Sequence, residues 1–214
     1  MARDLEKEKQ DKKGENIVHE FLERHFYNLT KNFNRYTDLE HQVNGIDTSF
    51  TIGGVEYKCD EKAAIDYRNY LKTFCLELSF LNRKNELTEG WLLNDNQQNN
   101  SYLFVWVDKT KNEQLTNECE ILNAEIALVM KDDIFKYLEK NGWTKDKLRI
   151  KANNIRNNND TSFGDIAENG LKFSFSKKLP EQPINVLLSR ETYEKFPHTI
   201  YRKIKTYNNN ERWM

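Results

Sequence analysis

The chain has 214 residues, with 33 Lys or Arg against 34 Asp or Glu, so its formal net charge at pH 7 is −1. This length suits one elaborated domain better than two, and 12% aromatic residues supply a core and exclude wholesale disorder. The balanced charge excludes a histone-like or tail-driven nucleic-acid binder, but it is compatible with a local basic groove.

The cysteines and the apolar runs indicate the compartment. Cys59, Cys75 and Cys119 show no CxxC spacing, which argues against a disulfide framework or a structural zinc site and suits a reducing cytoplasm. The charged first residues are unlike a secretory signal, and no apolar run approaches the ~20 residues of a membrane span. We therefore expect a cytoplasmic protein without a membrane partner.

Residues 4–29 carry a helical pattern. At 100° per residue, one apolar stripe is formed by Ile17, Val18, Phe21, Leu22, His25, Phe26 and Leu29. Glu15 lies at the border of this stripe, whereas Glu20 falls almost opposite. We expect Glu15 to be the acidic residue that faces the interior; a first-turn Glu favoured by the helix dipole is an equally good explanation of its position.

A β-hairpin is predicted within residues 44–62. Alternating runs flank Gly53-Gly54, and two glycines readily supply the positive φ angles of a tight turn. If these glycines form the loop, Ile52 pairs with Val55, and every later cross-strand pair follows from this register.

In that register Asp47 lies directly opposite Asp60, where two like charges roughly 4.5–5.5 Å apart at Cβ destabilise the strand pair. Lys62 shares the face of Asp60, while Glu61 points away. A hard divalent cation with oxygen ligands, Mg²⁺ or Mn²⁺, would relieve the repulsion. The alternative is a surface hairpin with ordinary charges.

The rest of the chain predicts a single domain with an α/β (α+β) fold, in which one central mixed sheet is flanked by helices. In the alternating strand 73–80, Glu77 lies opposite the apolar face, and we expect it to face the site rather than a structural salt bridge. The other expected elements are an irregular segment at 31–40, a helix or irregular excursion at 61–72, a loop at 82–100, strands at 101–108 and 125–130, a helix at 131–141 ended by Gly142, a long loop at 143–170, strands at 171–176 and 184–189 that close the sheet, a short helix at 190–196 and a basic tail from Pro197.

Asp47, followed thirteen residues later by Asp60-Glu61-Lys62, gives the pattern D-x12-D-x-K. Over residues 14–80 the chain resembles the PD-(D/E)xK phosphodiesterase superfamily with its restriction-endonuclease-like fold, although Ile46 replaces the proline of the motif. The internal competitor Glu56-x-Lys58 lies on the order of 13 Å along the strand from the partner of Asp47, so one metal ion could not bridge both positions.

The resemblance implies that Asp47 and Asp60 are metal ligands and that Lys62 is the catalytic lysine. Glu15 would support the metal or its water, the backbone carbonyl of Glu61 would complete the coordination sphere, and Glu77 would be an additional polar residue of the site and a further metal ligand. A bound Mg²⁺ or Mn²⁺ would neutralise the phosphate and lower the pKa of a water, and Lys62 would stabilise the developing charge.

The sequence therefore predicts a metal-dependent endonuclease or related phosphodiesterase, acting on DNA in preference to RNA, with a core at about 14–140 and further strands and a basic tail at 171–214. A homodimer is compatible with this prediction, since many relatives of this fold dimerise to cut both strands. The alternative is a non-catalytic nucleic-acid- or protein-binding module that retains the fold.

Overall fold

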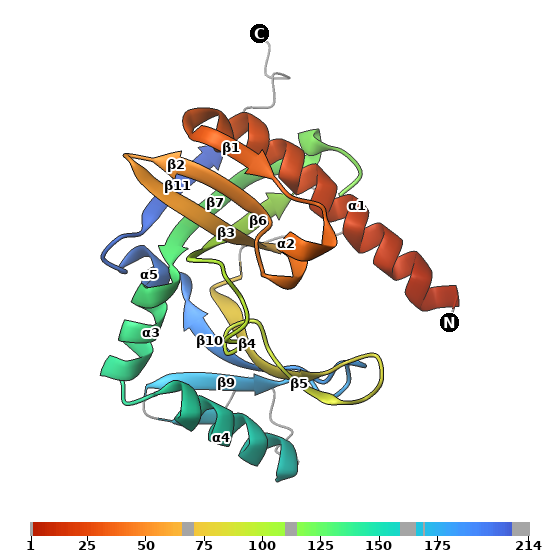
Figure 1. Cartoon of the computed structure of the whole chain (residues 1–214). Coiled ribbons are helices and arrows are strands. Elements are labelled where there is room, and N and C mark those ends of the chain that lie inside the picture. Colours follow the sequence, from red (N-terminus) through yellow and green to blue (C-terminus); the bar gives the residue numbers. More distant parts are fainter. Residues whose placement is uncertain (1, 66–70, 110–114, 159–165, 169, 207–214) are drawn as a thin grey trace, which may run out of the picture.

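Figure 1 shows the computed structural model of the chain, which describes residues 2–65, 71–109, 115–158, 166–168 and 170–206. Two sheets form its framework. Sheet A consists, in spatial order, of β1 (Lys31–Arg35), β2 (Thr48–Ile52), β3 (Val55–Ala64), β6 (Ser101–Lys109), β7 (Ile121–Met130) and β11 (Ile200–Lys205). Sheet B consists of β5 (Leu87–Glu89), β4 (Thr73–Leu81), β10 (Ile184–Ser189), β9 (Leu171–Phe175) and β8 (Ile166–Glu168).

Sheet A is mixed, because β3 and β6 pair in parallel while its other neighbours pair antiparallel. Sheet B is antiparallel. The helices are α1 (Ala2–His25), α2 (Leu39–Val43), α3 (Lys131–Lys140), α4 (Lys145–Asn157) and α5 (Arg190–Glu194), with 3₁₀ turns η1 (Tyr27–Leu29) and η2 (Glu118–Glu120). The chain is thus an α+β protein with a mixed sheet, as expected.

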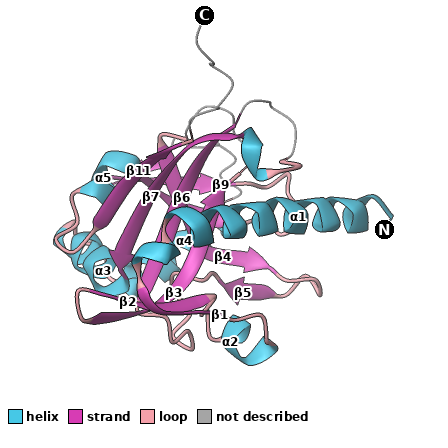
Figure 2. Ribbon diagram, turned by 90° about the horizontal axis from the view of Figure 1, so that it is seen from above, coloured by secondary structure: helices cyan, strands magenta, loops and turns pink. Residues whose placement is uncertain are grey.

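Sheet A is covered on both faces. Its strand β6 directs Tyr102, Phe104 and Trp106 to one face and Leu103, Val105 and Val107 to the other, and all six side chains are buried. Helix α1 covers the second face (Figure 2), while sheet B and helices α3 to α5 cover the first. A strand buried on both faces is a continuous apolar run, which is what residues 101–107 show.

The predicted apolar stripe of α1 is largely confirmed. Ile17, Val18, Phe21 and Leu22 are buried against sheet A. The residue that departs from the pattern is Leu29, which lies beyond the helix in η1 and is exposed. Glycine also ends α3 as expected, since Gly142 follows its last turn with a φ of +82°.

The β2–β3 hairpin has the predicted register. Its ladder runs from Ile52 opposite Val55 to Thr48 opposite Cys59. Gly53 and Gly54 have φ angles of +60° and +85°, the left-handed values that a two-residue type I′ turn requires at both positions.

The expectation of one central sheet is wrong. The strand at Thr73–Leu81 pairs with β10 and β5 in sheet B, and the late strands β9 and β10 also belong to sheet B rather than closing sheet A. Alternation of apolar and polar residues shows that a strand buries one face, but it does not tell which sheet the strand joins.

Five segments also differ from the prediction, and the first is the expected loop at 82–100, which contains β5. The irregular segment after residue 30 contains β1, and the tail from Pro197 contains β11, which pairs with β7. Strand β3 continues to Ala64 where a helix or excursion was expected, and residues 66–70 lie outside the described residues. The Asn-rich segment 143–170 contains α4, because Leu148, Ala152 and Ile155 form a buried stripe at helical spacing.

Among the residues that the structure describes, no helix combines the length and the apolar character that crossing a membrane requires.

Candidate active site

The chain reaches Asp47 through a well-defined helix end. At the end of α2 the N–H of Ile46 donates to the carbonyl of His41 at 2.9 Å, and the N–H of Gly45 donates to the carbonyl of Gln42 at 3.1 Å. These two bonds form a Schellman motif, which needs a left-handed residue at the position of Gly45, and Gly45 has a φ of +67°. The motif turns the chain into β2 and fixes where Asp47 lies.

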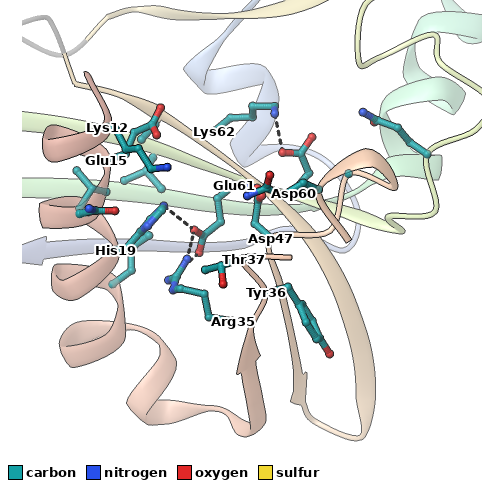
Figure 3. Close-up of a pocket in the computed structure, with 18 residues that line it drawn as sticks. Lys12, Glu15, His19, Arg35, Tyr36, Thr37, Asp47, Asp60, Glu61 and Lys62 are labelled. Atoms are coloured by element: carbon teal, nitrogen blue, oxygen red, sulfur yellow. Dashed lines mark hydrogen bonds and ion pairs between the residues drawn. The ribbon is translucent and has the colours of Figure 1, made fainter. Parts of the chain in front are cut away.

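Asp47, Asp60 and Lys62 meet at the end of the β2–β3 ladder (Figure 3). The N–H of Asp47 donates to the carbonyl of Cys59 at 2.9 Å, and its Oδ2 accepts the N–H of Glu61 at 2.8 Å. Lys62 donates from Nζ to Oδ1 of Asp60 at 2.6 Å. The hairpin register thus brings the three predicted residues together.

Burial sets the charge state of these groups. It raises the pKa of Asp60 to about 7, with the Lys62 ammonium opposing the shift and the Asp47 carboxylate adding to it. Burial by itself would lower the pKa of Lys62, but the carboxylates of Asp60, Asp47 and Glu77 outweigh it, so this pKa is raised. Lys62 is therefore a cation at neutral pH, and Asp60 is balanced between its acid and its carboxylate.

One oxygen of this group has no partner in the described part of the chain. The Asp60 side chain is 4% exposed, and its Oδ2 is buried without a hydrogen bond. An unsatisfied buried polar atom costs about 1–3 kcal/mol, so a structure retains it where something else satisfies it.

A cleft of about 460 Å³ opens beside this part of β3. Because β2 begins at Thr48, the described strands pair residues 61–64 on one side only, with β6. The cleft lies along the free side. Beyond Asp47, Asp60 and Lys62, its lining includes Lys12, Glu15 and His19 of α1, Arg35 at the end of β1, Gln42 of α2 and Gln97 of the loop before β6.

The side chain of Glu61 belongs to a different contact, as its opposite orientation predicts. Its carboxylate is 5% exposed and accepts from Arg35 Nη1 at 2.7 Å and from the hydroxyl of Tyr27. His19 Nε2 lies 3.3 Å from the same group, and Arg35 also donates from Nε to Glu23 at 2.8 Å. In Figure 3 Arg35 and His19 converge on Glu61 on the side away from Lys62.

Glu61 and its partners Arg35, Tyr27 and His19 form a cluster that we call the clasp. The clasp joins α1, β1 and β3 around one buried carboxylate. Burial lowers the pKa of Arg35, but the Glu61 carboxylate reverses the shift and raises it. Burial and the same carboxylate raise the pKa of Tyr27. The clasp therefore carries a carboxylate, a guanidinium and a neutral phenol, and it fixes the strand on which Asp60 and Lys62 stand.

The remaining predicted residues lie farther out. The expectation that Glu15 faces the interior is wrong, because Glu15 is exposed on the α1 wall of the cleft, across from Asp60 (Figure 3). Glu20 is exposed and outside the lining. Glu77 is half-buried on β4 and outside the lining; it acts on Lys62 as a nearby charge. In the described part of the chain, no group of three or more His, Cys, Asp or Glu could hold a metal ion, so the four carboxylates do not converge.

Arg35 and Gln97 are among the residues of the cleft that sequence reasoning missed. Arg35 stands in the segment expected to be irregular, although a charged residue such as Glu61 in a buried strand signals that a cationic partner must exist. Gln97 stands in a polar Asn/Gln loop, where no signal distinguishes it from its neighbours.

Comparison with protein-family models, with characterised proteins and with solved structures gave no match for this chain.

Proposed function

We propose that the protein is a metal-dependent phosphodiesterase that hydrolyses nucleic acid, DNA in preference to RNA. One observation carries the proposal: two carboxylates and a protonated lysine, Asp47, Asp60 and Lys62, share one cleft beside the free edge of β3. Their order in the chain and their hairpin register are those of the PD-(D/E)xK pattern.

The residues fit a hard divalent cation. Oδ2 of Asp60 is a buried oxygen acceptor without a hydrogen bond, and carboxylate and carbonyl oxygens are the ligands that Mg²⁺ and Mn²⁺ prefer. Because N–H and C=O of one strand residue face the same side, the carbonyl of Glu61 faces Asp47 as its N–H does. Two carboxylates suffice, since Mg²⁺ usually keeps several waters and binds through one or two carboxylates.

The charges of the cleft also call for a cation. The strand side of the lining carries Asp47 and Asp60 against Lys62, and on the α1 side Lys12 is offset by Glu15. A polyanionic substrate entering a cleft without net positive charge meets no net attraction. When bound, a divalent cation would supply the missing positive charge and lower the pKa of the attacking water.

Lys62 acts in this proposal as a fixed positive charge. Hydrolysis breaks one P–O bond and adds water across it, so negative charge accumulates on the phosphate and on the leaving oxygen. The raised pKa of Lys62 keeps it protonated in the metal-free site, and an ammonium at this position is suited to stabilise that charge. Its hydrogen bond to Asp60 and the ring of Trp91, 5.2 Å from Nζ, hold the ammonium in place.

The direct test is cleavage of labelled plasmid, single-stranded DNA and RNA with Mg²⁺ or Mn²⁺, with EDTA as blank. We expect Lys62→Ala and Asp60→Asn to lower the rate by about 10²–10³-fold, as loss of a charge-stabilising group does. Lys58→Ala and Glu56→Gln are matched controls, since both residues are exposed on the same face of β3.

Equal cleavage by wild type, Lys62→Ala and Asp60→Asn would rule out this site. Binding of nucleic acid without cleavage under any metal condition would instead favour the non-catalytic module.

A further inference from the structure

We propose that Gln97 is a further oxygen donor of this site, which binds the divalent cation or a water of its hydration shell through Oε1. This inference rests on the proposed function and names a residue outside the D-x12-D-x-K pattern. Its basis is the way in which the chain holds the Gln97 amide in the cleft.

The loop that carries Gln97 is bound to the end of α2. The N–H of Gln98 donates to the carbonyl of Asn44 at 2.8 Å, and its side-chain amide donates to Oδ1 of Asn44 at 3.3 Å. The N–H of Gln97 closes a turn on the carbonyl of Asn94 at 3.3 Å. A residue of a long polar loop is thereby fixed beside the Schellman turn that positions Asp47.

Gly45 provides the space for the amide. A Cβ at this position would lie 2.8 Å from Cδ, 3.0 Å from Oε1 and 3.1 Å from Nε2 of Gln97. Any side chain would therefore displace the amide. The glycine thus has two roles, the left-handed φ of the helix end and the close approach of Gln97 to the backbone two residues before Asp47.

The amide oxygen has no partner. Oε1 of Gln97 is buried without a hydrogen bond, as is Oδ2 of Asp60. Of the described side chains that line the cleft, these two carry the buried oxygens left unsatisfied. Each such acceptor costs about 1–3 kcal/mol unless it meets a donor or a positive charge.

The chemistry of Asp60 Oδ2 and Gln97 Oε1 indicates which kind of ligand the cleft binds. Lys62 donates to the other oxygen of Asp60, so Oδ2 of Asp60 and Oε1 of Gln97 are acceptors that a ligand must satisfy with a donor or a positive charge. A carboxylate oxygen and an amide oxygen are both ligands of hard divalent cations. Residues that orient a metal ion or its waters typically change its affinity about 10–100-fold when they are replaced.

The test is calorimetric titration of the full chain with Mn²⁺ alone, without substrate. We expect wild type to bind one ion, Asp60→Asn to abolish binding, and Gln97→Ala to weaken it about tenfold. Gln97→Glu restores an acceptor at the same reach and should bind at least as tightly as wild type. Asn96→Ala removes a neighbouring amide that is exposed and outside the cleft lining, and should bind like wild type.

Thermal unfolding of each apo variant shows that it is folded, and Gln97→Glu keeps the test decisive if Gln97→Ala does not fold. If Asp60→Asn abolishes Mn²⁺ binding but Gln97→Ala binds within twofold of wild type, the role of Gln97 is overturned and the proposed function still stands. If wild type binds no Mn²⁺, or binds it regardless of Asp60, the proposed function fails at its site and the role of Gln97 fails with it.

Discussion

Replacing Asp60 by asparagine should change how the stability of the metal-free protein depends on pH. Asparagine keeps the size of the side chain and an oxygen that can accept from Lys62, but it does not titrate. The substitution therefore removes a buried ionisable group with little change in packing, and the difference between the two proteins isolates the Asp60 proton.

The sign and the size follow from the shifted pKa. An aspartate in an unfolded chain has its ordinary pKa of 3.8, whereas burial raises the pKa of Asp60 in the folded protein to about 7. Between these values the folded state binds more protons, so the free energy of unfolding falls as the pH rises. The contribution is fully present below about pH 4 and lost once the pH has passed about 7. At about 1.4 kcal/mol per pH unit, the whole window is worth roughly 4 kcal/mol.

The assay is urea denaturation in EDTA at pH 5 and pH 8, where about 3 kcal/mol of that total should be lost by wild type. We expect Asp60→Asn to gain stability relative to wild type by this amount over the same interval. Glu56→Gln, an exposed change on the same strand, should follow wild type. Parallel profiles for wild type and Asp60→Asn would refute the reasoning, because Asp60 would then ionise as freely in the folded chain as in the unfolded one.

Three further substitutions test the contacts of Glu61 and the contact between Gly45 and Gln97 separately. Glu61→Gln leaves the partly buried guanidinium of Arg35 with one carboxylate fewer, and should lower the free energy of unfolding by about 3 kcal/mol in urea denaturation; a loss below about 0.5 kcal/mol would show that the clasp is not structural. Gly45→Ala and Gly53→Ala both place alanine at a positive φ and should each cost about 1–2 kcal/mol, but a Cβ at Gly53 meets no atom within 4 Å, whereas one at Gly45 meets Gln97. Mn²⁺ affinity should therefore fall in Gly45→Ala alone, and equal affinity in the two variants would contradict the contact.

The part of the site that could be predicted is the part that local rules determine. A Gly-Gly turn fixes the register of a hairpin, and side chains alternate strictly along it, so the positions of Asp47, Asp60 and Lys62 relative to one another follow from the sequence. The apolar face of α1 follows from its helical periodicity, and the doubly buried strand β6 follows from its continuous apolar run.

The other features depend on contacts between distant segments. The alternation around Glu77 is correct, but β4 belongs to a second sheet, and no local pattern reveals how two sheets pack. Arg35 and Gln97 reach the cleft because β1 and a polar loop are held against β2 and α2 by backbone hydrogen bonds, which any residue can make. Such backbone contacts cannot be predicted from the types of side chain in the sequence.

Because β3 has a free edge at the site, exchange of its backbone amide protons can report whether the cleft is occupied. Successive N–H groups of a strand point to opposite sides, so the amide of Lys62 faces β6, while that of Ala63, which lines the cleft, points the same way as the amide of Glu61. The exchange rate of the Ala63 amide proton with solvent deuterium should therefore fall when any ligand fills the cleft, and the Lys62 amide in the same strand serves as an internal reference. Occupancy could then be followed without label, turnover or knowledge of the substrate.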